Sequence, residues 1–294
     1  MSLHHLDPSD SREPPRTDAI RHLDPGRRTG FGLGLRPKHF GDALAGGLAV
    51  DCVEIIAENF VGRGGRPRAA LDRVRRDASV LVHAVGMDVA GFDPIDMGHV
   101  LGIRDLADEI EADLVSDHLC FSRLGGRHGH DLWPVPRTVE TLERVAARIC
   151  RIQDALGRRI ALENIAAYVD FASNEMAELD VWLELFSRTD CLMLLDLNNA
   201  YVSSVNLGGH PEDLIEGLPE KRVVQIHLAG HSELGAGLLD DHGSPVADEV
   251  WRLYERAVRR FGPVATIVER DAEVPPLDVL LAEVAQARSI ARAS

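Results

Sequence analysis

Eight short runs of aliphatic and β-branched residues recur along this chain from Gly30 onward, each followed by a longer stretch with helical spacing. Each run and its following stretch take about 30 residues, which is the length of a β-strand with its crossover helix. The runs are residues 31–36, 52–58, 79–85, 114–119, 159–165, 191–197, 223–228 and 264–270. Eight such units predict an α/β protein with the (β/α)8 TIM-barrel fold.

Two of the helical stretches carry clear boundary signals. Residues 138–156 begin with Thr138 as a candidate N-cap, have Glu140 in the first turn and stop at Gly157, and residues 247–261 stop before Gly262. Because no linker or shift in composition interrupts residues 29–294, we expect them to form a single catalytic barrel domain. Residues 1–28, rich in Pro, Ser, Asp and Arg, are predicted to form a flexible tail.

The charge and the cysteines exclude several classes of protein. With 47 acidic and 32 basic residues, the net charge of −15 argues against partners such as nucleic acid or an anionic membrane surface. No apolar run has the length of a membrane span, and the first 28 residues lack the apolar stretch of a signal peptide. The four cysteines are widely spaced and form no C-x-x-C pair, so we expect neither a disulfide framework nor a thiolate zinc site, and a cytoplasmic location.

Polar residues end seven of the eight runs, although strands buried on both faces should read as continuous apolar segments. In chain order these residues are Glu58, His83, Asp117 with His118, Glu163, Asp196 with Asn199, His227 and Glu269. The carboxyl ends of the strands in such a barrel converge on one funnel. Because buried imidazoles and carboxylates are costly without compensation, a shared cation is the simplest explanation for the set. The sequence therefore predicts a metal cluster.

Each of these residues also has a purely structural interpretation. His83 alone could be a hydrogen-bonded structural histidine, Asp117 could cap a helix, and Glu163 with its neighbour could pair with an arginine at the rim. Asp196 could cap a following turn, because Asn198 and Asn199 favour turns. The joint pattern favours metal binding, because the structural interpretation would require a separate, independent reason for the polar residue at each strand end.

One further pair follows the seventh run. Asp240 and His242 lie two residues apart in the segment LLDDHGSP, and in an extended segment they would project to the same side and could hold one ion. The alternative interpretation is a solvated acidic turn that ends at Gly243.

Longer motifs resemble a known family. GLGLRPKHF, VEIIAEN, VSDHLCFS, LLDLNNAYVSSVNLG, QIHLAGH, DDHGSPV and TIVERDAEVP together closely resemble the multinuclear non-heme iron-dependent oxidative enzymes (MNIO), over about Gly30 to Leu281. The resemblance implies a xylose-isomerase-like barrel, related in layout to sugar isomerases and zinc-dependent apurinic endonucleases.

The resemblance also implies which residues hold the metals. His83 and His118 would bind one ion, and Glu163 would bridge it to a second. Asp196, His227 and Glu269 would complete the second site. Asn199, Asp240 and His242 would form a third, with Asn199 as its weakest donor. Asp117 stays open as an alternative to His118.

By the same resemblance, the cofactors are Fe(II)/Fe(III), about two or three ions per chain, with O₂ as co-substrate. The implied reaction is oxidation of a residue, above all cysteine, in a ribosomally synthesised precursor peptide, with a separate peptide-recognition protein as partner. Glu163, Asp271 and Glu58 are the candidate catalytic residues. The groups expected around the ligands or the substrate are Arg36, His39, Asn164 and His231.

Two other functions remain open. The donor set contains only nitrogen and oxygen, so zinc or manganese would also fit, and the same layout could serve an isomerase or a phosphodiesterase. The chain could also be a metal-binding scaffold without turnover.

Overall fold

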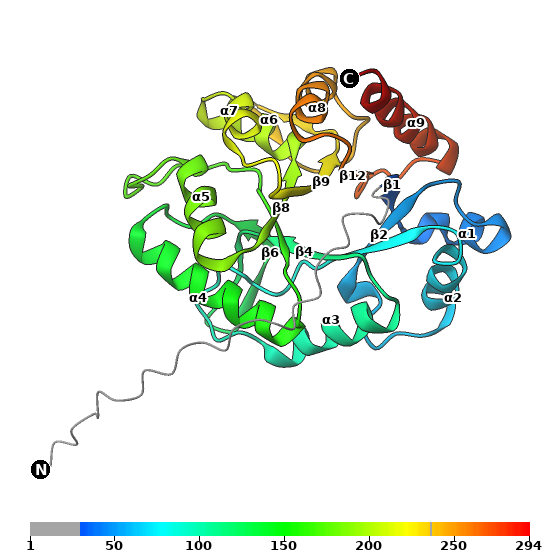
Figure 1. Ribbon diagram of the computed structural model, residues 1–294, viewed down its shortest axis with the longest axis horizontal. Helices are drawn as coiled ribbons and strands as arrows, with labels where there is room; N and C mark the ends of the chain where they lie inside the picture. The colour runs from blue at the N-terminus through cyan, green and yellow to red at the C-terminus, as the bar shows by residue number, and fades with distance from the viewer. Residues whose placement is uncertain (1–29, 236) are drawn as a thin grey trace, which may run out of the picture.

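Eight parallel strands close into a barrel in this computed structural model, which describes residues 30–294 apart from Ala236. The strand order around the barrel is β1-β12-β9-β8-β7-β4-β3-β2, and Figure 1 shows helices surrounding it. The strands are β1 (Phe31–Gly34), β2 (Cys52–Ile56), β3 (Ser79–His83), β4 (Leu114–His118), β7 (Ala161–Glu163), β8 (Leu192–Asp196), β9 (Val223–Leu228) and β12 (Ala265–Val268). Each lies inside one predicted run, so the (β/α)8 fold is confirmed. The predicted tail, residues 1–28, lies outside the described residues.

The helices pack their apolar faces on the outside of the barrel. They are α1 (Phe40–Gly46), α2 (Gly65–Val74), α3 (Met97–Glu109), α4 (Val139–Leu156), α5 (Glu178–Thr189), α6 (Leu197–Leu207), α7 (Glu212–Gly217), α8 (Asp248–Phe261) and α9 (Leu277–Ala293), with short 3₁₀ turns η1 (Pro37–His39) and η2 (Ala57–Asn59). No helix in the described part of the chain has the length and apolar character needed to cross a membrane.

Both predicted helix boundaries are confirmed. The Thr138 hydroxyl accepts a hydrogen bond from the Thr141 amide at 3.2 Å and so caps α4. Gly157 ends α4 in the left-handed conformation, with φ of 65°, which a glycine adopts without strain. Helix α8 ends at Phe261, directly before Gly262.

Two antiparallel hairpins at the carboxyl ends of the strands were not predicted. They are β5 (Phe121–Leu124) with β6 (Arg127–Trp133), after β4, and β10 (Ser232–Leu234) with β11 (Gly237–Leu239), after β9. Asp88 accepts hydrogen bonds from the amides of Ser122 and Arg123 at 2.7 and 3.2 Å. Asp93 accepts two more from the amides of residues 125 and 126 at the β5–β6 turn. These hydrogen bonds therefore hold the first hairpin in place both in strand β5 and at its turn.

Alternation along the strands decides which side chains enter the barrel. Residues two apart on a strand point to the same face. A separate apolar cluster fills the barrel interior, with Cys52, Leu81, Leu114, Ala161, Leu192, Leu194, Ala265 and Ile267. The inward positions that follow on β3, β4, β7, β8, β9 and β12 are His83, His118, Glu163, Asp196, His227 and Glu269. The apolar filling thus gives way to polar groups at one end of the barrel.

Candidate metal centre

The inward polar residues form three groups whose candidate ligand atoms lie within 4.8 Å of one another. The groups are His83, His118 and Glu163; Glu163, Asp196, His227 and Glu269; and His242, Glu269 and Asp271. Glu163 belongs to the first two groups and Glu269 to the last two. The three groups therefore make one continuous cluster that is joined by shared carboxylates.

The first group presents two imidazoles to one carboxylate oxygen. Nε2 of His83 and Nε2 of His118 are 3.3 Å apart, and each lies 3.4 Å from Oε2 of Glu163. Nδ1 of His83 is held by the Ser116 hydroxyl at 2.9 Å. Burial lowers the pKa of His83 to about 4, so its ring is neutral near pH 7 and keeps a nitrogen lone pair.

Asp117 lies behind His118 and outside this group. Its Oδ2 accepts a hydrogen bond from the Met87 amide at 2.8 Å, and its Oδ1 accepts one from the His118 amide. Neighbouring residues on a strand point to opposite faces, so only one of the two can face the barrel interior. Of the two alternatives left open by the sequence, His118 is the residue that joins the cluster.

The second group surrounds Nδ1 of His227. That atom lies 3.0 Å from Oε2 of Glu269, 3.7 Å from Oε1 of Glu163 and 3.8 Å from Oδ2 of Asp196. Burial raises the pKa of Asp196 well above its ordinary value, and the nearby Glu163 raises it further. A cation among these groups would relieve the repulsion between the carboxylates.

The two oxygens of Asp196 do different things. Oδ1 accepts a hydrogen bond from the Asn199 amide at 2.6 Å and caps α6, which begins directly at Leu197. Oδ2 is buried, has no hydrogen-bond partner and faces the cluster. The side chain of Asn164 pairs with both backbone groups of Asp196, each at 2.9 Å, and fixes its position. The capping and ligand interpretations of Asp196 are therefore compatible, since each uses its own oxygen.

The third group centres on His242. Its Nε2 lies 2.8 Å from Oδ1 of Asp240, and its Nδ1 lies 3.2 Å from Oδ2 of Asp271 and 3.4 Å from Oε2 of Glu269. Asn199 lies beside the bridging carboxylate, where its Nδ2 donates to Oε1 of Glu163 at 3.3 Å. The predicted third set, Asn199, Asp240 and His242, stays a prediction, and the structure adds Asp271 and Glu269 as acidic neighbours of His242.

A cavity of about 680 Å³ opens onto the cluster. Its lining includes the predicted catalytic residues Glu58, Glu163 and Asp271. Arg36 also lines it and donates to Glu269 at 3.1 Å and to Asp271 at 2.5 Å. Three residues expected around the ligands or the substrate are not part of this lining. His39 contacts the Pro275 carbonyl, His231 contacts the Asn198 side chain, and the Asn164 side chain pairs with the backbone of Asp196.

Buried polar atoms without partners supply a test of whether metal ions fit. Such atoms are uncommon in folded proteins and call for an explanation. Six of them belong to candidate ligands: Oε2 of Glu163, Oδ2 of Asp196, Oδ1 of Asn199, Nδ1 of His118, Nδ1 of His227 and Nε2 of His242. Together with the imidazole of His83, they make a donor set of nitrogen and oxygen that fits iron, manganese or zinc. The cluster has the composition of a metal centre.

His99, which was not predicted from the sequence as a site residue, lies on α3 and lines the cavity. Nε2 of His99 donates to Oε1 of Glu58 at 3.0 Å, and that oxygen also accepts from the Val85 amide at 3.1 Å. The hydrogen bond to Glu58 raises the pKa of His99. Burial raises the pKa of Glu58, but the hydrogen bonds from His99, its own backbone and the Val85 amide together outweigh it, so the Glu58 pKa lies below its ordinary value. The two therefore form an ion pair in the cavity wall.

This pair predicts a pH-dependent contribution to stability. The Glu58 contribution is present above the ordinary pKa of 4.5 and is lost as pH falls through its lowered folded value. The His99 contribution is present below the ordinary pKa of 6.5 and is lost as pH rises through its raised folded value. We expect a double-mutant cycle of His99→Ala and Glu58→Gln, measured by urea unfolding, to give a coupling of about 1 kcal/mol near pH 6.

The same coupling should fall toward zero as the pH rises above the raised pKa of His99, where the imidazole is neutral. His210→Ala removes an exposed imidazole and serves as the control, for which we expect no such pH dependence. A coupling that persists undiminished at the higher pH would contradict the ion pair.

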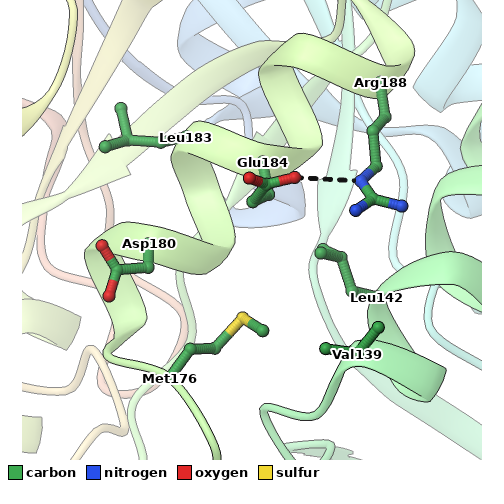
Figure 2. Close-up of a pocket in the computed structure, with 7 residues that line it drawn as sticks. All are labelled: Val139, Leu142, Met176, Asp180, Leu183, Glu184 and Arg188. Carbon is green, nitrogen blue, oxygen red and sulfur yellow. Dashed lines mark hydrogen bonds and ion pairs between the residues drawn. The ribbon is translucent and has the colours of Figure 1, made fainter.

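A second hollow of about 360 Å³ lies between α4 and α5 (Figure 2). Figure 2 shows apolar side chains, including Met176 and Leu142, around it, and an ion pair of Glu184 with Arg188 at its edge, 3.1 Å long. Its seven lining residues include no histidine or cysteine. The groups suited to metal chemistry therefore line the barrel cavity and not this one.

Comparisons with known proteins agree with this geometry. The family model described as "RiPP precursor modification enzyme MbnB/TglH/ChrH" matches residues 30–292. RiPP denotes a ribosomally synthesised and post-translationally modified peptide. A UPF0276 protein of Anaeromyxobacter sp. (strain Fw109-5) is 47% identical over 268 residues, which cover 91% of this chain and 95% of that protein.

Solved structures share the fold. A xylose isomerase domain protein from Planctomyces limnophilus aligns with a TM-score of 0.57 and 13% identity, covering 90% of this chain and 98% of that one. Endonuclease IV from Thermus thermophilus aligns with a TM-score of 0.56 and 19% identity, covering 88% of this chain and 98% of that one. These similarities show the xylose-isomerase-like barrel and carry no information on the reaction.

Proposed function

We propose a function from the premise that this chain belongs to the MbnB/TglH/ChrH family of RiPP precursor modification enzymes, the MNIO family. Membership implies an enzyme that acts on a precursor peptide. We propose further that it is an oxidase that uses iron and O₂, and that the residue it modifies is a cysteine.

The observation that carries this proposal is the continuous cluster with shared carboxylates. Glu163 and Glu269 each belong to two groups of candidate ligands, as expected of a site for adjacent ions. His83, His118, Asp196 and His227 would complete the coordination from barrel strands, while Asn199, Asp240 and His242 would serve the third position. When bound, iron would supply affinity for a substrate thiolate and for O₂.

The residues around the cluster would prepare the substrate. The cavity of about 680 Å³ has room for a peptide side chain with its flanking backbone, and the tied β5–β6 hairpin would wall it from solvent on one side. Glu58, held by His99, would contact the peptide from one wall. Asp271, held by Arg36, would do so from another.

The proposed partners are the precursor peptide and a separate protein that recognises it. Among the residues described, none forms a domain beyond the barrel, its helices and its rim hairpins, and peptide recognition in trans is consistent with that. We place the reaction in the cytoplasm, where the four free thiols of Cys52, Cys120, Cys150 and Cys191 would remain reduced.

The proposal is tested by purifying the protein without oxygen, reconstituting it with Fe(II) and counting metals by mass spectrometry. We expect about two or three irons per chain. A short cysteine-containing peptide encoded beside the gene, supplied with the partner protein, should change mass only when O₂ is admitted. Less than one iron per chain together with tight stoichiometric zinc would overturn the proposal. Turnover of a ketose or of abasic DNA without O₂ would favour the zinc or manganese enzyme instead.

A further inference from the structure

A polar layer lies inside the barrel, one step below the candidate metal centre. Glu54 of β2 is 1% exposed and Gln225 of β9 is fully buried. Both occupy inward positions, and Gln225 precedes His227 by two residues on the same face of its strand. Branched apolar side chains usually fill this level of a barrel, as Leu194 does on the neighbouring strand. A buried carboxylate at this depth needs specific partners.

Glu54 finds those partners across the barrel. Its Oε1 lies 3.0 Å from Nε2 of His227, at ion-pair distance but without a hydrogen bond, and its Oε2 accepts a hydrogen bond from Nε2 of Gln225 at 2.5 Å. Gln225 thus holds one carboxylate oxygen while the other faces the imidazole. No function assigned above uses either residue.

The ring of His227 is turned in the opposite sense to the other two strand histidines. His83 and His118 bring Nε2 to the cluster. His227 instead brings Nδ1, which is buried, makes no hydrogen bond and points at the carboxylates of the second group. The other ring nitrogen, Nε2, therefore faces away from the cluster and into the barrel interior, where only a protein group can contact it.

A neutral imidazole carries one N–H and one lone pair, so its two nitrogens cannot both donate. When Nε2 carries the proton and faces the charged Oε1 of Glu54, the lone pair lies on Nδ1 and is directed at the cluster. Gln225 Nε2 is 2.9 Å from His227 Nε2 and could instead donate to it, which would place the proton on Nδ1. The charged oxygen of Glu54 disfavours that tautomer, because it would then face a lone pair.

We propose that Glu54 is a positioning residue for the metal centre: it fixes the ring and tautomer of His227 so that Nδ1 is free to bind the ion shared with Asp196, Glu163 and Glu269. Carboxylates that hold a ligating histidine in this way commonly tune metal affinity. The inference rests on the proposed metal centre and deepens it. It predicts that the ion bound by His227 depends on Glu54, whereas the other ions do not.

The test uses the full chain, dialysed without oxygen against graded Fe(II), with bound iron counted by mass spectrometry. We expect Glu54→Gln to weaken the binding of one Fe(II) ion per chain by about 10- to 100-fold and to leave the affinity for the other ions unchanged. Gln keeps the size of the side chain but can donate to Nε2, which favours the wrong tautomer. His227→Ala should weaken the binding of the same ion. The double variant should bind that ion no more weakly than His227→Ala alone.

Cys52→Ala is the matched control, since it alters the same strand on the same interior face, one step farther from the cluster. We expect it to bind iron as the unaltered chain does. Unchanged affinity in Glu54→Gln, or an equal further loss when it is added to His227→Ala, would overturn the positioning role. An unaltered chain that binds no Fe(II) would overturn the metal centre and this inference together. Binding without peptide turnover would overturn the proposed reaction alone, because this test measures metal affinity.

Discussion

Replacing Glu163 with Gln is expected to lower kcat/KM for the precursor peptide by about 10³-fold or more, which corresponds to about 4 kcal/mol of lost transition-state stabilisation. Oε2 of Glu163 faces two imidazoles at 3.4 Å, and Oε1 lies 3.7 Å from Nδ1 of His227. Gln preserves the shape but removes the charge and one acceptor. A bridge between two ions needs both, so we expect at least one ion per chain to be lost.

The measurements are the iron count and the single-turnover rate in the same preparation. Glu184→Gln makes the same chemical change at the surface hollow of Figure 2 and should leave both unchanged. A full iron count with undiminished rate in Glu163→Gln would contradict the bridging role. The far-ultraviolet circular dichroism of the two variants should match, because Glu163 lies at the end of its strand and Gln keeps an oxygen that can accept from Asn199 of α6.

Replacing Arg36 with Met is expected to lower the free energy of unfolding by about 3–5 kcal/mol before metal is added. The Arg36 guanidinium is buried and donates to both Glu269 and Asp271. Burial alone would lower its pKa, but these carboxylates outweigh that and raise it. Met keeps most of the length and leaves the buried Glu269 and the half-exposed Asp271 without their cation.

Urea unfolding with and without Fe(II) measures this effect. Added metal should recover part of the loss, because it supplies positive charge to the same carboxylates. Arg188→Met removes a cation from the half-exposed pair with Glu184 and should cost no more than about 1 kcal/mol. A loss in Arg36→Met as small as that of the control would contradict the role of Arg36 as the buried counter-ion.

The strands of the barrel were predictable because they are buried on both faces and read as continuous apolar runs. The β5–β6 hairpin was not, since RHGHDLW is rich in charged and polar residues and lacks apolar alternation. Helix α6 begins at Leu197, where the turn-prone Asn198 and Asn199 favour a loop, because Asp196 caps it. In that case a tertiary position at the strand end overrides local preference.

The candidate ligands were predictable from polar residues at strand ends, while the groups that hold them were less so. Glu54 lies in the same VEIIAEN segment as Glu58, but a single Glu inside an apolar run does not by itself indicate a functional role. Its position two residues from the inward Ile56 was the available signal. His99 carried none, because only the fold brings a helix residue beside Glu58.

The β5–β6 hairpin forms part of the wall of the proposed peptide site, whereas most of the proposed metal ligands lie at the ends of barrel strands. The β5–β6 hairpin contributes Arg123, His128 and Leu132 to the cavity wall, and none of the proposed ligands lies within it. Loops at this face accept substitution and insertion readily, whereas the spacing of strand residues is fixed by the ladder of the barrel. Descendants of one ancestor could therefore exchange hairpins and acquire new peptides, while inheriting the same nine proposed metal ligands unaltered.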